Sequence, residues 1–154
     1  MSELFADSIT WAVIFCPAKS DDPHWTARLL HRDFAHCYLI RECGDGALVI
    51  DPLGWGIATR FEDKPFNDVV LHHAQDATAC LLYVADYRFN TYAIGRAFYS
   101  CVSVVKAALG LRSGRLVQTP KALYKYLLTR RGASLIRPWS PWTGGKHERA
   151  ILKT

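Results

Sequence analysis

The sequence has no apolar run that approaches the ~20 residues of a membrane-spanning helix, so no transmembrane segment is expected. It contains no internal repeat, and its five cysteines include no Cys-x-x-Cys pair. Their odd number argues against a disulfide framework, and their spacing does not match the close pairs of a structural zinc site. No metal and no cofactor are therefore expected, and the thiols fit a reducing compartment.

The N-terminus lacks the basic segment followed by an apolar one that marks a secretory signal, so the cytoplasm is the default expectation. Acidic residues are scarce at the other end of the chain. Residues 121–154 carry eight Lys/Arg and one acid, whereas residues 1–120 carry 11 Lys/Arg and 13 Asp/Glu. This asymmetry indicates either contact with an acidic surface or a solvated basic tail. No recognised nucleic-acid-binding module accompanies these charges, so nucleic acid is not expected as a partner.

The chain does contain enough apolar material for one folded domain, because 50% of its 154 residues are hydrophobic. Segments rich in β-branched and aromatic residues predict strands over 8–16, 34–41, 47–52, 57–61 and 79–85. The segment 66–71 fits either a strand or a short turn of helix. Capping residues predict helices over 100–110 and 119–132, and proline and glycine argue against regular structure beyond Leu135.

These segments together predict an α+β fold. An antiparallel sheet is expected to pack against a cysteine-bearing helix and a second, C-terminal helix. The domain is expected to span residues 1–136, followed by a basic extension over 137–154 that is rich in proline, glycine and tryptophan.

The helix predicted over 100–110 carries the first functional signal. Ser100 is a good N-cap and Gly110 a good C-terminal stop, so Cys101 is the first residue inside the helix. At that position the unpaired amides and the positive end of the helix dipole stabilise a thiolate. Cys101 is therefore a candidate nucleophile, and the alternative interpretation is a small buried apolar residue.

A cysteine nucleophile needs a base, and the base needs a group that orients it. His36 is the best candidate base, because it lies centrally in a strongly predicted strand. Asp51 ends the next strand, and the segment Cys43–Gly46 between them signals a turn. A two-residue turn places Asp51 on the same sheet face as His36, and a three-residue turn places it on the opposite face. We expect the cysteine helix to pack on the face that bears His36.

Four stretches carry a resemblance to a known family. They are Phe-Ala-His-Cys-Tyr-Leu-Ile over 34–40, Val-Ile-Asp-Pro over 49–52, Ser-Cys-Val-Ser-Val-Val-Lys over 100–106 and Thr-Pro-x-x-Leu-Tyr over 119–124. In this order, over residues 30–130, the chain resembles the circularly permuted, NlpC-like branch of the papain-like cysteine hydrolases. In that branch the cysteine helix follows the sheet instead of preceding it.

The resemblance implies a small papain-like domain that performs acyl transfer through Cys101, His36 and Asp51. Its substrate would be a peptide amide, such as a bacterial cell-wall peptide, or an acyl ester. The backbone amide of the cysteine would stabilise the oxyanion. The side chains expected to support the oxyanion or line the substrate are Tyr99, Tyr38 and Trp55.

A non-catalytic interpretation stands beside this one. A small papain-like domain can be a structural or adaptor piece of a larger assembly, such as a phage particle or tail, and the protein would then reside in a viral particle. Trp139 and Trp142 favour a contact by the basic extension, because large apolar side chains are rarely fully exposed in an idle tail. They are expected to pack on the domain itself or on a partner protein. Fast, selective alkylation of Cys101 would favour the enzyme.

Overall fold

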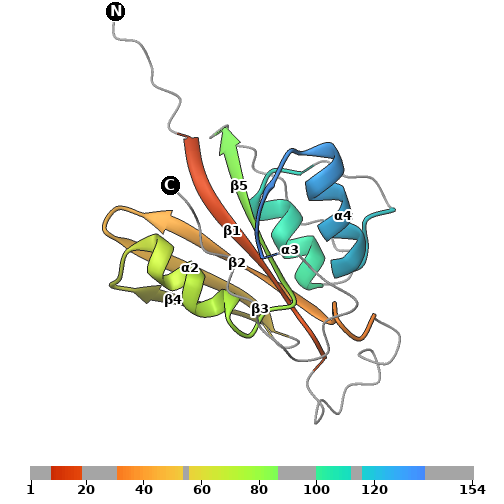
Figure 1. Ribbon diagram of the computed structural model, residues 1–154, viewed down its shortest axis with the longest axis horizontal. Helices are drawn as coiled ribbons and strands as arrows, with labels where there is room; N and C mark the ends of the chain where they lie inside the picture. The colour runs from red at the N-terminus through yellow and green to blue at the C-terminus, as the bar shows by residue number, and fades with distance from the viewer. Residues whose placement is uncertain (1–7, 19–30, 54–55, 87–99, 112–115, 138–154) are drawn as a thin grey trace, which may run out of the picture.

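The computed structural model describes residues 8–18, 31–53, 56–86, 100–111 and 116–137 (Figure 1). It is an α+β fold with one antiparallel sheet. The strands are β1 (Ser8–Cys16), β2 (His36–Cys43), β3 (Gly46–Leu53), β4 (Gly56–Glu62), β5 (Ala79–Asp86) and β6 (Ser134–Arg137), in the spatial order β4-β3-β2-β1-β5-β6. The helices are α2 (Phe66–Ala74), α3 (Cys101–Ala108) and α4 (Pro120–Arg130). Within the described ranges, no helix is long and apolar enough to cross a membrane.

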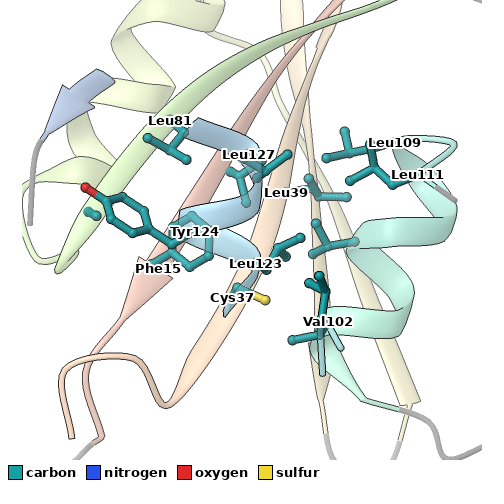
Figure 2. Close-up of a cluster of buried hydrophobic side chains, with 14 of the residues drawn as sticks. Phe15, Cys37, Leu39, Leu81, Val102, Leu109, Leu111, Leu123, Tyr124 and Leu127 are labelled. Atoms are coloured by element: carbon teal, nitrogen blue, oxygen red, sulfur yellow. The ribbon is translucent and has the colours of Figure 1, made fainter. Parts of the chain in front are cut away.

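The two faces of the sheet are covered by different helices, as Figure 1 shows. Side chains alternate along each strand, so consecutive residues of β2 face opposite sides. Cys37 and Leu39 face α3 and α4, and they belong to the larger core cluster, much of which is drawn in Figure 2. Ile40 belongs to the smaller cluster beneath α2, and the Tyr38 ring packs against that cluster.

The start of β2 is anchored by an aromatic group. Phe34 is fully buried just before the strand, and its ring centroid lies 5.8 Å from that of Phe15 and 5.2 Å from that of Tyr124 on α4. Such ring pairs add about 0.5–1.5 kcal/mol each beyond the area that they bury. The backbone that carries His36 is therefore fixed both by β1 and by α4.

The β2–β3 hairpin has the two-residue turn that places Asp51 and His36 on one face. Cys43 pairs with Gly46, so Gly44 and Asp45 form the turn. Gly44 has a φ of 56°, a left-handed conformation that favours glycine. The register continues to Leu39 opposite Ile50, and its next step sets Asp51 opposite Tyr38. Of the two alternatives that the sequence left open, the structure contains the two-residue turn.

The structure decides one open alternative of the sequence analysis and corrects one expectation. The segment from Phe66 forms helix α2, one of the two alternatives, and it continues to Ala74. The expectation of irregular structure beyond Leu135 is wrong, because β6 runs to Arg137 and pairs with β5 at the edge of the sheet. An edge strand needs only one neighbour, so four residues suffice before Pro138 ends the run.

Candidate active site

Helix α3 begins and ends as its capping residues predict. Ser100 is extended, its side-chain oxygen accepts a hydrogen bond from Ser103 N at 3.1 Å, and Ser100 N donates to Ser103 Oγ at 3.0 Å. This reciprocal pair is a capping box. At the other end Gly110 has a φ of 64°, and Leu111 N donates to Lys106 O at 2.8 Å, which closes the last turn.

The capping box leaves two donors at the start of α3. The first amides of any helix have no partner inside it, and here the box takes those of Ser100 and Ser103. The N–H groups of Cys101 and Val102 remain, within the described part of the chain, at the positive end of the helix dipole. The sulfur of Cys101 thus lies beside N–H groups that can donate to, and so stabilise, a developing negative charge.

His36 and Asp51 form a short ion pair beyond the end of the β2–β3 ladder. Nε2 of His36 lies 2.6 Å from Oδ1 of Asp51, and the two side chains are 32% and 35% exposed. Solvent can therefore reach both groups. Because Nε2 donates to the carboxylate, Nδ1 is the ring nitrogen left for another partner.

That other partner is Cys101. Burial alone would lower the pKa of His36, but hydrogen bonds to Asp51 and to Cys101, together with the negative charges of both, raise the pKa to about 9. An imidazolium is therefore the favoured form at neutral pH. The positions of His36 at the first residue of β2 and of Cys101 at the first residue of α3 bring the two side chains together.

The pKa of Cys101 moves in the opposite direction. The largest cause is a hydrogen bond from the Cys37 side chain, which lowers the pKa. The hydrogen bond and positive charge of His36 and the backbone N–H of Cys37 lower it further, and together these contributions outweigh burial, which raises it. The pKa falls to about 5. The geometry favours a thiolate–imidazolium pair at neutral pH, with the carboxylate of Asp51 on the far side of the ring.

One expectation about this arrangement is wrong. Helix α3 was expected on the sheet face that bears His36, but Val102 and Val105 pack in the cluster of Cys37 and Leu39, on the opposite face. The pair with Cys101 still forms, because His36 is the terminal residue of its strand and lies beyond the β2–β3 ladder, which begins at Leu39. The site lies at the end of the strand and not on one face of the sheet.

Cys37 is the site residue that sequence reasoning missed. Its side chain is 0% exposed, and burial, followed by its hydrogen bond to Cys101 and the charge of that thiolate, raises the pKa of the Cys37 thiol well above its usual range. It is therefore a neutral donor to Cys101. Its position next to His36 in the strand gave no signal, because neighbours in a strand face opposite sides.

A second polar network lies under α2. Tyr38 Oη is 2.7 Å from His73 Nδ1, and His73 Nε2 is 3.3 Å from Glu62 Oε1, which also accepts from Arg60. Burial raises the pKa of Tyr38, so its phenol stays protonated and donates to His73. The Tyr38 ring stacks on the ring of His36, with centroids 6.1 Å apart. Tyr38 thus links this network to the imidazole at the strand end.

The remaining residues singled out from the sequence lie outside the described residues. They are Trp55, Tyr99, Trp139 and Trp142. Among the described side chains, no group of three or more His, Cys, Asp or Glu is arranged to hold a metal ion.

Comparisons with protein-family models, with curated proteins and with solved structures gave no match to this chain.

Proposed function

We propose that this protein is a thiol hydrolase or acyltransferase that cleaves an amide or ester bond through Cys101, His36 and Asp51. The observation that carries the proposal is the position of the His36 imidazole, which hydrogen-bonds to a carboxylate through Nε2 and to the thiol of a helix N-terminus. Nucleophile, base and orienting group are then in contact, in the arrangement that nucleophilic catalysis requires.

The reaction follows from the charges of these groups. The Cys101 thiolate attacks the carbonyl carbon, and the carbonyl oxygen becomes an oxyanion that accepts from the Cys101 N–H. His36 donates its proton to the leaving amine or alcohol, which departs and leaves a thioester on the sulfur. The now neutral imidazole takes a proton from water or an acceptor alcohol or amine, whose oxygen or nitrogen displaces the thiolate. Asp51 holds the ring and stabilises its charged form.

Element order supports the papain-like part of the proposal. A strand that carries the base is followed by a neighbouring strand that carries the acid, and a helix that opens with the nucleophile comes later in the chain. In this proposal the chain is a circularly permuted papain-like domain. Its substrate is a peptide amide, with a bacterial cell-wall peptide as one case, or an acyl ester.

The test is acylation of the intact protein by an activated ester, p-nitrophenyl acetate, read by intact mass and peptide mapping. We expect a burst of nitrophenol and one acetyl group on Cys101. His36→Ala should abolish the burst. The matched control is Cys43→Ala, which removes a partly exposed thiol at the hairpin turn and should leave the burst unchanged.

Peptide amides and cell-wall peptides are then tested with the same variants. Turnover that requires Cys101 and His36 supports the proposal. An unreactive Cys101, or acetylation spread equally over Cys43 and Cys101, contradicts it and favours the non-catalytic, assembly-forming interpretation.

A further inference from the structure

Two thiols meet at the start of α3, and the acyl-transfer reaction needs only one of them. Cys37 is fully buried in the core cluster under α3 and α4, and Cys101 packs against the edge of the same cluster. In Figure 2 the Cys37 sulfur points toward α3, the helix that Cys101 opens. Neither cysteine is in a disulfide.

We propose that Cys37 and Cys101 form a reversible oxidation site, in which a hydroperoxide joins the two sulfurs in a disulfide. The proposal rests on the thiolate of the proposed active site, but it requires no acyl transfer. Oxidation would remove the nucleophile, and a thiol reductant would restore it.

The geometry suits a disulfide. The Cys101 sulfur accepts hydrogen bonds from both the side chain and the backbone N–H of Cys37. A sulfur that reaches both the thiol and the amide of one residue lies close to that residue's backbone. A disulfide requires Cα atoms within about 7 Å, and α3, which Cys101 opens, packs directly on the sheet face that carries Cys37.

The chemistry has two balanced steps. The Cys101 thiolate attacks the terminal oxygen of the hydroperoxide, an S–O bond forms, the O–O bond breaks, and the alcohol or water departs after protonation. The Cys37 sulfur then attacks the sulfenic sulfur, an S–S bond forms, and the hydroxyl group leaves as water with the proton that Cys37 releases. The peroxide gains two electrons and the two cysteines lose them.

The local charges set the order of these steps. Cys101 is partly exposed and can meet the oxidant, whereas Cys37 is buried and held as a thiol partly by the negative charge of Cys101. Conversion of Cys101 to the neutral sulfenic acid removes that charge. Cys37 therefore becomes reactive only after Cys101 has been oxidised.

Cys16 supplies the matched control. It is opposite His36 in the β1–β2 register and packs with the cluster beneath α2, so it lies on the other face of the sheet from Cys37. It is the other cysteine whose charge bears on Cys37. Oxidation without a preferred partner would also join Cys16 to Cys37, whereas the proposed pairing depends on the contact between Cys37 and Cys101.

The experiment treats the intact protein with hydrogen peroxide at neutral pH and follows its mass. The wild type and Cys16→Ala should each lose about 2 Da, with a peptide map that joins residues 37 and 101, and dithiothreitol should restore alkylation of Cys101. Cys37→Ser, which preserves the side-chain size, should instead gain about 16 Da and proceed to the irreversible sulfinic acid. Cys37→Ala gives the same result if the serine variant does not fold.

Several results would overturn the proposal: a sulfinic acid at Cys101 of the wild type without a disulfide, a bond between Cys16 and Cys37, or a loss of about 2 Da at Cys101 that survives in Cys37→Ser. The mass readout needs no substrate. A protein that forms the 37–101 disulfide but is not acylated by p-nitrophenyl acetate refutes the proposed function and supports the oxidation site. A protein that is acylated but forms no disulfide supports the proposed function and refutes the oxidation site.

Discussion

The pH dependence of Cys101 alkylation tests the thiolate–imidazolium pair most directly. The pKa of Cys101 is about 5, against an ordinary value of 9.0. The lowered pKa keeps the thiolate of Cys101 populated as the pH falls, until about pH 5. At pH 6 about 90% of Cys101 is thiolate, compared with about 0.1% of an ordinary cysteine, because each pH unit is a tenfold change in the ratio.

The gain in thiolate is partly offset by a weaker nucleophile. With a Brønsted slope of about 0.4–0.5, four pKa units lower the reactivity of each thiolate by about 40–100-fold. Cys101 should thus react with iodoacetamide about 10–20-fold faster than the same cysteine in the urea-unfolded chain at pH 6, and about 20–50-fold slower at pH 9. The alkylation rates of the folded and unfolded chains should be equal near pH 7, because there the larger thiolate fraction of folded Cys101 is offset by the lower reactivity of its thiolate.

The assay is timed alkylation from pH 4 to pH 10, with peptide mapping to follow residue 101 by itself. The folded protein should show a plateau that begins near pH 5, and the unfolded chain a single rise centred near pH 9. His36→Ala should move the folded profile toward higher pH, because it removes a hydrogen bond and a positive charge from the thiolate. Superimposed profiles for the folded and unfolded states would refute the ion pair.

Two further predictions concern the surroundings of Cys101. Asp51→Asn should lower the pKa of His36 from about 9, because the carboxylate raises it. The stability that His36 contributes to the fold is fully present below its unfolded pKa of 6.5 and is lost as the pH rises through its folded pKa. In the variant this loss of stability should therefore occur at lower pH. An NMR titration of the imidazole that shows no change would count against the pair. Ser100→Ala and Thr119→Ala each remove an N-cap and should each cost about 1 kcal/mol in urea unfolding. Only Ser100→Ala should also slow alkylation of Cys101, and equal effects of the two on alkylation would show that the α3 cap has no special role.

Local signals account for most of the elements that the sequence predicted. Helix α3 could be predicted from Ser100 and Gly110, which cap its two ends in the structure. The hairpin could be predicted from the turn residues between its strands, of which Gly44 and Asp45 form the turn. Helix α2 was ambiguous because Pro65 precedes it and no side chain caps its first turn. Strand β6 was missed because four residues carry little periodicity.

The site was predictable only in part. The contact of His36 with Asp51 follows from hairpin register, which is a local property of β2 and β3. The contact of Cys37 with Cys101 joins residues far apart in the chain, and it depends on which sheet face α3 covers. The alternation of side chains along a strand determines which residues share a face of the sheet. Because both faces of this sheet are apolar and are covered by helices, that alternation does not determine which helix covers which face.

The order of strands in the sheet also has a consequence for folding. Strands β2, β3 and β4 are joined by short connections and pair with their neighbours, so His36 and Asp51 can meet early. Strand β5, in contrast, must close a long loop to pair with β1, and α3 follows it in the chain. Cys101 therefore joins His36 only after the slow, long-range contacts have formed. Until then Cys101 is an ordinary thiol, and a nascent or misfolded chain carries no activated sulfur.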